Sequence, residues 1–359
     1  MNRRKFMGLC AGAVAAELTG CRTSPTAIPP WTGRDEIRAF LMHLGHNMWC
    51  EWLPQDVKTS LPERSTPDLR LRTKDALWRR VTDRAAARKL NMIVIDIGEG
   101  LVFPSHPELA IEGSWSPDRM RDEIRRLRGL GLEAIPKLNF SATHDGWLKD
   151  YHRMLTTPKW YEVVRDVIRD VAEIFDTPRY FHLGFDEEET GHSGGLNYFV
   201  MRTGDLWWHD FLFAVRCCED CGCRPWAWSD YGWDHPDYFT RCPKSVVQSN
   251  WYYDEAYGGF DLATNETIDR KRLKEFWDLE KAGFDQIPCG TNWAGWMRQR
   301  KKVGADDVIG KLVKLGREVI SKDRLLGFMM APWKPCDNEA NTEVNLRGVD
   351  LLAAALKGS

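Results

Sequence analysis

Strand-like and helix-like segments alternate along this chain, and this alternation constrains the fold more than any other feature. The segment 92–97 reads as a buried strand, and a helical pattern with a Ser-Pro start runs from Ser116 to about Leu130. Strands that alternate with helices pair in parallel, and eight such units close into a (β/α)8 barrel. The expected strands are 40–45, 92–97, 132–138, 179–185, 225–228, 244–249, 284–289 and 325–330, and the expected helices are 74–90, 116–130, 158–174, 205–218, 267–281, 305–320 and 344–356.

The fifth strand–helix unit is the weakest, because its connection, residues 229–243, is mostly loop. An open doubly wound sheet is the alternative fold, but no glycine-rich phosphate loop follows the first strand. Roughly 330 residues is a normal length for one α/β barrel. We therefore expect residues 35–359 to form a single α/β domain, a (β/α)8 TIM barrel.

The first residues of the chain carry two signals for export. Arg3 and Arg4 begin a twin-arginine signal, and the apolar run that follows is too short to span a bilayer. The sequence Leu-Thr-Gly before Cys21 is typical of a lipoprotein cleavage site, which would leave Cys21 as the lipid-bearing first residue. We expect a signal peptide over 1–21, a tether over 22–34, and a protein held by its lipid in the periplasm or cell envelope.

Four of the ten cysteines, Cys217, Cys218, Cys221 and Cys223, form a C-C-x-x-C-x-C cluster. Export permits disulfides, so one or two local bridges are the favoured interpretation. A structural zinc is the alternative, because Cys218 and Cys221 have ligand-like spacing. The connectivity of the cluster cannot be read from the sequence.

Net charge and tryptophan content narrow the classes of partner. The formal net charge of −2 gives no indication of a nucleic-acid partner. Seventeen Trp are present, and many lie near predicted strand ends, as expected of platforms on which sugar rings stack. Any single Trp is more often a packing residue. We expect a carbohydrate partner, and contact with a membrane only through the lipid.

Four consecutive carboxylates, from Asp186 to Glu189, follow the fourth predicted strand. Active sites of α/β barrels lie at the carboxyl ends of the strands. Two adjacent carboxyl groups can have their pKa values pushed apart, so that one acts as an acid while the other stays ionised. The alternative is a solvated acidic turn, and we interpret Glu188 and Glu189 as solvated or loop-capping residues.

The other strand ends carry amides, carboxylates and aromatic rings. This inventory fits carbohydrate chemistry, and the sequence shows no Ser–His–Asp set at a nucleophile elbow. We expect neither a cofactor nor a metal. Glu99 could instead cap a helix, and His182 could be a hydrogen-bonded core residue. The side chains at these ends are Asn47, Trp49, Glu99, Asn139, His144, Trp228, Asp230, Asn250, Trp251, Tyr252, Asp254, Asn292, Trp293 and Trp333.

The segment His182-Leu-Gly-Phe-Asp-Glu187 resembles the His-x-Gly-Gly-Asp-Glu signature of the family-20 glycoside hydrolases, the β-N-acetylhexosaminidases. Enzymes of that family are (β/α)8 barrels with this motif at the end of the fourth strand. The resemblance implies that Glu187 is the general acid/base and that Asp186 orients the 2-acetamido group of the substrate. That group is the nucleophile in this substrate-assisted, retaining route.

Further parts of the chain extend the resemblance. Tyr252 and Asp254 match the family's Tyr-x-Asp, whose Tyr binds the acetamido carbonyl and whose Asp binds sugar hydroxyls. His144 is placed like the His that supports the acid. The remaining residues that we expect at the site are Trp228, Trp293 and Trp333 as pocket walls, Asn139, Glu99 and Asn47 as binding residues, and His182 as a supporting residue.

The chain departs from the family pattern at several positions. Phe185 stands where the motif has its second Gly, and the first strand lacks the sugar-binding Arg, with Asn47 near its place. Lys334 and Pro335 follow Trp333, where the family often has a hydroxyl-binding Glu. We also expect the small α/β domain that usually precedes the barrel to be missing.

Three functions follow from these observations. The first is an exported glycosidase acting on β-linked N-acetylhexosamine or a related 2-acetamido sugar. The second is a barrel glycosidase for a different glycan, with Glu99 or Asp230 as the partner of Glu187, which the missing Arg and Glu favour. The third is a glycan-binding lipoprotein without catalysis.

Overall fold

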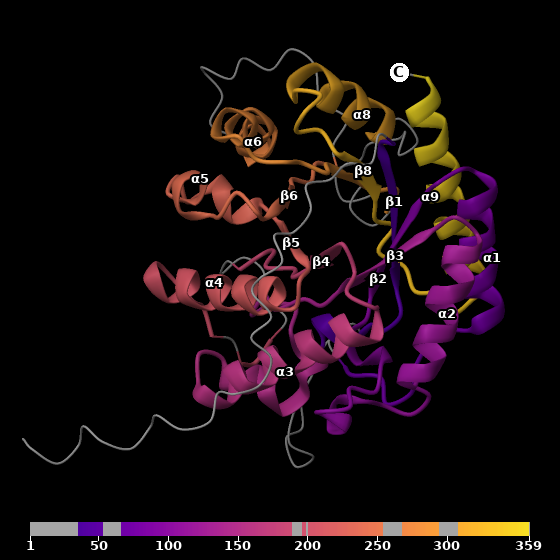
Figure 1. Cartoon of the computed structure of the whole chain (residues 1–359), viewed down its shortest axis with the longest axis vertical. Coiled ribbons are helices and arrows are strands. Elements are labelled where there is room, and N and C mark those ends of the chain that lie inside the picture. The colour runs from indigo at the N-terminus through magenta and orange to yellow at the C-terminus, as the bar shows by residue number, and fades with distance from the viewer. Residues whose placement is uncertain are drawn as a thin grey trace, which may run out of the picture.

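Eight parallel strands form the centre of the molecule, and helices surround them (Figure 1). The computed structural model describes residues 35–52, 66–188, 196–198, 200–253, 268–293 and 308–358, so the predicted signal peptide and the whole of the predicted tether lie outside it. The strands are β1 (Ile37–His43), β2 (Met92–Asp96), β3 (Glu133–Lys137), β4 (Tyr180–His182), β5 (Arg224–Trp228), β6 (Val247–Ser249), β7 (Cys289–Gly290) and β8 (Gly327–Met330). The helices are α1 (Asp75–Ala87), α2 (Pro117–Gly129), α3 (Pro158–Ile174), α4 (Asp205–Asp220), α5 (Tyr238–Arg241), α6 (Ile268–Ala282), α8 (Val308–Val319) and α9 (Glu339–Lys357), with short 3-10 helices η1 (Asn47–Trp49), η3 (Gly98–Gly100), η4 (Pro107–Leu109), η5 (Gly146–Met154) and η7 (Asp230–Trp233).

The strands close into an almost complete barrel. Their order is β6-β5-β4-β3-β2-β1-β8-β7, and every pair in it is parallel. The two outermost strands of this order are β6 and β7. Two isolated bridges connect the chain at these strands: Trp251, just after β6, pairs with Cys289, and Gln248 of β6 pairs with Gln286, just before β7. The predicted (β/α)8 TIM barrel is therefore confirmed.

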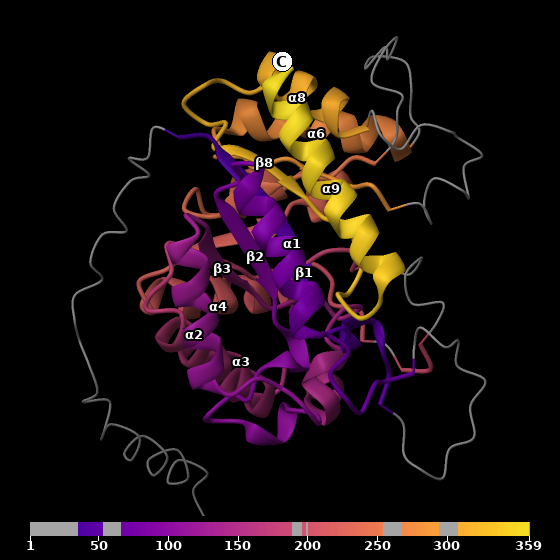
Figure 2. The ribbon, with the colours of Figure 1, turned by 90° about the vertical axis from the view of Figure 1, so that its right-hand side faces the viewer.

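The helices cover the outside of the sheet with their apolar faces. In α3, Thr157 caps the first turn by accepting from the backbone N–H of Trp160, Pro158 takes the first helical position, and residues such as Val163 and Val167 are buried. Helices α1 and α9 lie side by side over β1 (Figure 2). Among the described helices, none combines the length and the apolar character needed to cross a membrane.

Alternation along the strands divides the core in two. On β1, Phe40 and Met42 pack in the cluster beneath the helices, whereas Ala39 and Leu41 pack in the cluster inside the barrel. The interior also holds a buried ion pair. Lys137 Nζ donates to Asp96 Oδ2 at 2.7 Å, and this charge outweighs the effect of burial and lowers the pKa of Asp96.

Some element boundaries differ from the sequence prediction. Helix α9 begins at Glu339 rather than at 344, because Asn338 caps it by accepting from the N–H of Asn341 at 2.9 Å. Strand β7 is only two residues long. The connection of the fifth unit, predicted to be mostly loop, contains two four-residue helices, η7 and α5, and no long helix.

The cysteine cluster does not contain the predicted local bridges. All four of its members are thiols at the end of α4 and just beyond it. Cys218 Sγ donates to the carbonyl oxygen of Cys223 at 3.6 Å, and Cys223 Sγ donates to that of Cys221 at 3.9 Å. Packing of Cys217, Cys218 and Cys223 into the core accounts for the cluster, and within the described residues it does not converge as zinc ligands do.

Candidate active site

The chain turns sharply after β4 and presents two carboxylates. Gly184, Phe185 and Glu187 have φ values of 75°, 68° and 57°, in the left-handed region that favours glycine. A Cβ at Gly184 would lie 2.1 Å from Asn139 Oδ1, so this position needs glycine. Phe185 is held in its strained conformation by aromatic packing, with ring centroids 5.1 Å from Phe211. Strain of this kind often marks functional sites.

Asp186 is fixed by the loop that follows β3. Its Oδ1 accepts from Asn139 Nδ2 at 2.7 Å, and its carbonyl oxygen accepts from Ser141 Oγ at 2.5 Å. Asn139 Oδ1 in turn accepts from the backbone N–H of Phe185 at 3.2 Å. Asn139, predicted to bind substrate, thus has its side chain engaged in holding Asp186.

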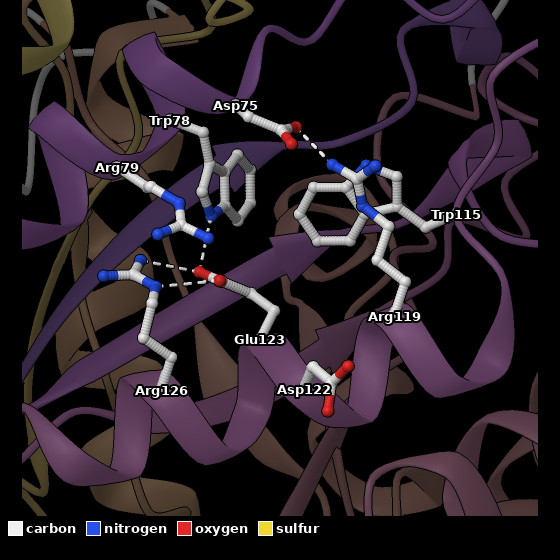
Figure 3. A pocket seen from close by; sticks show the side chains of 8 residues that line it. All are labelled: Asp75, Trp78, Arg79, Trp115, Arg119, Asp122, Glu123 and Arg126. Carbon is white, nitrogen blue, oxygen red and sulfur yellow. Dashed lines mark hydrogen bonds and ion pairs between the residues drawn. The ribbon is translucent and has the colours of Figure 1, made fainter.

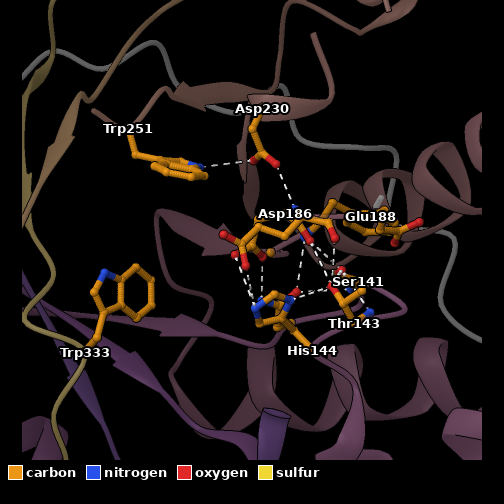
Figure 4. A network of polar contacts seen from close by, with 12 residues as sticks. Ser141, Thr143, His144, Asp186, Glu188, Asp230, Trp251 and Trp333 are labelled. Atoms are coloured by element: carbon orange, nitrogen blue, oxygen red, sulfur yellow. Dashed lines mark hydrogen bonds and ion pairs between the residues drawn. The ribbon is translucent and has the colours of Figure 1, made fainter. Parts of the chain in front are cut away.

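His144 contacts both carboxylates of the pair (Figure 4). Its Nε2 lies 3.4 Å from Glu187 Oε2 and 3.9 Å from Asp186 Oδ2. Its Nδ1 lies 2.7 Å from Thr143 Oγ1, which fixes the ring on the other side. Burial alone would lower the pKa of His144, but the charges of Asp186 and Glu187 outweigh it and raise this pKa. The imidazolium is therefore stabilised beside the two carboxylates.

A third carboxyl group, Asp230, approaches the pair from β5. Its Oδ2 accepts from the backbone N–H of Glu187 at 2.8 Å, and its Oδ1 accepts from Trp251 Nε1 at 3.3 Å. Burial and the charge of Asp186 raise the pKa of Asp230 to about 8, although both N–H donors favour the ionised form. Sequence reasoning had considered Asp230 only as an alternative catalytic partner.

The same group could also accept a metal ion. Among the residues that the structure describes, His144, Asp186 and Glu187 are the one set of three or more His, Cys, Asp or Glu side chains whose ligand atoms lie within 4.8 Å of one another. One imidazole and two carboxylates can bind a divalent ion such as zinc. The side chains are equally suited to moving a proton without a metal, because Glu187 keeps about a quarter of its surface exposed, at 26%.

Glu188 does not have the solvated position that we predicted. Its side chain is 1% exposed, and its Oε1 accepts from the N–H of Ala142 at 3.0 Å and from Arg202. Arg202 also donates to Asp210 Oδ2 at 3.2 Å. The interpretation of Glu188 as solvated was wrong, because its side chain pairs with Arg202, which lies 14 residues further along the chain. Its hydrogen bond with the N–H of Ala142 is a form of loop capping. Glu189 lies outside the described residues.

Aromatic rings line the side of the site that faces β5, β6 and β8. The ring centroids of Trp228 and Trp333 are 5.8 Å apart, and Trp333 Nε1 donates to the hydroxyl of Tyr253 at 3.2 Å. Tyr253 belongs to the cluster inside the barrel, whereas Tyr252, the predicted site residue, packs in the outer cluster. Two-residue alternation from Val247 through Trp251 to Tyr253 is the signal that could have identified Tyr253.

The remaining predicted residues have other surroundings. Glu99 is buried, and its Oε1 accepts from the backbone N–H groups of His46 at 2.7 Å and Asn47 at 3.0 Å. Burial raises the pKa of Glu99 to about 7. The Asn47 side chain exchanges hydrogen bonds of 2.9 and 2.8 Å with the backbone of Asp68. Both residues therefore hold the loop after β1.

Three further predicted residues complete the set. His182 is fully buried on β4, where its Nδ1 accepts from the N–H of Gly184 at 3.1 Å and its ring lies 4.7 Å from that of Trp228. Trp293 is half-buried after β7, and its backbone N–H donates to Thr291 Oγ1 at 3.0 Å. Asp254 lies outside the described residues.

A cavity of about 290 Å³ lies elsewhere, on the outside of the barrel between α1 and α2 (Figure 3). Several of its polar groups are paired with one another. Trp78 Nε1 donates to Glu123 Oε1 at 2.8 Å, and Arg119 pairs with Asp75 while its guanidinium lies 4.5 Å from the ring centroid of Trp115. The residues that line this cavity do not include the carboxylate pair or His144, so we do not place the reaction centre there.

The fold and the site together define a (β/α)8 barrel with a pair of carboxylates, supported by a histidine, after its fourth strand. No protein-family model matches the chain, and no curated protein matches it in sequence.

Solved structures do resemble it. The β-N-acetylhexosaminidase of Bacteroides fragilis is similar over 88% of this chain and 65% of its own, with a TM-score of 0.58 and 14% identity. The family-20 exo-β-N-acetylglucosaminidase of Vibrio harveyi is similar over 90% of this chain and 57% of its own, with a TM-score of 0.54 and 14% identity. A catalytic module of the pneumococcal exo-β-D-N-acetylglucosaminidase StrH is similar over 89% of this chain and 84% of its own, with a TM-score of 0.53 and 13% identity.

The chain thus spans less than two thirds of the first two proteins, at 65% and 57%. At 13–14% identity the structural similarity shows a shared fold alone, and it agrees with the (β/α)8 barrel fold that the resemblance implies.

Proposed function

We propose that this chain is a glycoside hydrolase that cleaves β-linked N-acetylhexosamine glycosides with retention of configuration. Glu187 gives its proton to the glycosidic oxygen, and the carbonyl oxygen of the substrate's 2-acetamido group attacks the anomeric carbon. Asp186 orients that group and stabilises the positive charge that it acquires. Glu187 then takes a proton from the water that opens the cyclised intermediate.

The observation that carries this proposal is the unequal support of two adjacent carboxylates. The Asp186 side chain is 9% exposed and its Oδ1 accepts from Asn139, as suits a group that is held in one orientation. Glu187 is more exposed, at 26% of its side chain, and faces His144, as suits a group that exchanges a proton. The similarity in fold to β-N-acetylhexosaminidases supports the same assignment.

The test is hydrolysis of an aryl N-acetyl-β-glucosaminide and of the matching galactosaminide over a range of pH. We expect release of the aryl alcohol with initial formation of the β-anomer of the sugar. An acetamido-sugar thiazoline, which mimics the cyclised intermediate, should bind to the wild type and less tightly to Asp186→Asn. Absence of both turnover and thiazoline binding at every pH would overturn the proposal.

The second candidate is a barrel glycosidase for another glycan, in which a second carboxylate takes part directly. Asp230 favours it, because this group lies beside Glu187. Glu99 does not, since its side chain is occupied by the loop after β1. Turnover of glycans that lack a 2-acetamido group would favour this candidate, and saccharide binding by calorimetry without any product would favour a binding protein.

We further propose that the protein is exported folded and anchored by lipid at Cys21. The twin-arginine segment and the residues before Cys21 support this. Cells fed a radioactive fatty acid should label the wild type and not Cys21→Ser. Equal labelling of the two, or no labelling of either, would contradict the anchor.

A further inference from the structure

Asp230 occupies an unusual position between two parts of the site. It starts the 3-10 helix η7 after β5, and only Ser229 separates it from that strand. One carboxyl oxygen accepts from the backbone N–H of Glu187. The other accepts from the indole of Trp251, as Figure 4 shows. A single side chain therefore connects the turn that carries Glu187 to the aromatic wall that follows β6.

The backbone N–H of Glu187 needs a fixed partner. Glu187 has a φ of 57°, a conformation that is strained for a residue with a Cβ and persists only where the surroundings hold it. The neighbouring contacts act on other atoms: Thr143 Oγ1 donates to the carbonyl oxygen of Glu187 at 3.1 Å, and His144 contacts its carboxylate. The N–H is fixed from β5 by Asp230.

Trp251 holds the other side of Asp230. Its ring is 5% exposed and lies 4.6 Å from the ring centroid of Trp233, and the Arg272 guanidinium is 4.6 Å from the ring centroid of Trp251. The indole N–H therefore points at Asp230 from a ring that packing keeps in place. Both terminal atoms of an aspartate side chain are oxygens, so it can accept from two converging N–H groups, which an asparagine cannot do.

We propose that Asp230 is a positioning residue for the acid: it fixes the backbone of Glu187 by accepting from its N–H while the indole of Trp251 fixes Asp230. This inference rests on the proposed function for its kinetic readout. In it, Asp230 acts by holding Glu187 in place and does not contact the substrate.

The test is a set of four variants, Asp230→Asn, Trp251→Phe, the double variant and Asp234→Asn. In Asp230→Asn an NH2 group must face either the Glu187 N–H or the indole N–H, and we expect kcat to fall about tenfold to hundredfold with little change in KM. Trp251→Phe removes the competing indole N–H. In the double variant the asparagine oxygen is then available to Glu187, and kcat should recover to within severalfold of Trp251→Phe.

Asp234→Asn is the matched control, because Asp234 is a half-exposed residue just after η7 that pairs with Lys271. It should retain wild-type kcat. If the double variant had a lower kcat than Asp230→Asn, the inference would be overturned, because the losses from two purely structural changes add. An Asp230→Asn variant with the kcat and KM of the wild type would overturn it as well.

Crystal structures of the wild type and Asp230→Asn give a readout that needs no turnover. We expect the Glu187 carboxylate of Asp230→Asn to move away from His144, and an unmoved Glu187 would overturn the inference. A wild type without hexosaminidase activity would instead refute the proposed function, and the crystallographic comparison would still decide the role of Asp230.

Discussion

Arg202 Nε donates to Glu188 Oε2 at 3.1 Å, which joins a fully buried guanidinium to the carboxylate directly after Glu187. The same guanidinium donates to Asp210 Oδ2 on α4 at 3.2 Å and to the carbonyl oxygen of Phe140 after β3 at 2.8 Å. Arg202 therefore connects the loops after two neighbouring strands to a helix behind them. This buried charge network holds together the loops at the carboxyl ends of β3 and β4.

Removing this cation should be costly, because it would leave the buried carboxylates of Glu188 and Asp210 without the positive charge that pairs with them. Arg202→Met should lower the free energy of unfolding by about 3–5 kcal/mol, measured by urea denaturation. Arg80→Met is the matched control: its side chain is 44% exposed and pairs with Glu339 and Glu343, so the loss should be much smaller than in Arg202→Met. Equal losses in the two variants would contradict the role of Arg202.

Glu187, the proposed acid, gives the most direct kinetic prediction. Glu187→Gln cannot donate a proton to the glycosidic oxygen, and kcat should fall about 10²- to 10⁴-fold while the fold is retained. Glu162→Gln, at an exposed residue of α3 that pairs with Lys159, should keep wild-type kcat.

Asp186→Asn should also have a low kcat, and azide should restore little activity because the nucleophile is part of the substrate. Strong rescue of Asp186→Asn by azide would argue for a nucleophilic carboxylate instead.

Much of the fold could be predicted from the sequence, because local signals determine it. The alternation of apolar strands and amphipathic helices predicted all eight strands, and Ser116 with Pro117 predicted the start of α2. The start of α9 was missed because its cap, Asn338, lies in a polar stretch without an apolar pattern. Helix periodicity marks the buried face of a helix better than it marks its first turn.

The site was only partly predictable, because its contacts are long-range. Counting strands placed Asp186 and Glu187 correctly after β4. Alternation on β6 favours Tyr253 over Tyr252, but the family motif drew attention to Tyr252. The partner of Glu188 is separated from it by 14 residues of chain, and no spacing rule connects the two.

The left-handed turn before the carboxylates should not tolerate a side chain at its first residue. In Gly184→Ala, the new Cβ would lie 2.1 Å from Asn139 Oδ1 and 2.7 Å from Asn139 Cα at a φ of 75°, so Asn139 must move. We expect a loss of about 2–4 kcal/mol in unfolding free energy and a fall in kcat as Asp186 loses its donor. Gly129→Ala at the end of α2, where a Cβ meets nothing within 4 Å, should be neutral or slightly stabilising. A Gly184→Ala protein with wild-type stability and kcat would show that the turn can relax.

Glu99 should make stability depend on pH in a direction that is unusual for a carboxyl group. Burial raises its pKa from 4.5 to about 7, so between these values the folded chain keeps a proton that the unfolded chain releases. Its contribution to stability is present below pH 4.5 and is lost as pH rises through 7, by up to about 3 kcal/mol. Glu99→Gln mimics the protonated group and keeps an oxygen for the N–H of His46, so its unfolding free energy, measured in urea from pH 5 to 8, should decline less than that of the wild type. Glu112→Gln, whose side chain is 66% exposed, should follow the wild-type curve. Parallel curves for Glu99→Gln and the wild type would mean that Glu99 is ionised in the folded protein throughout this range.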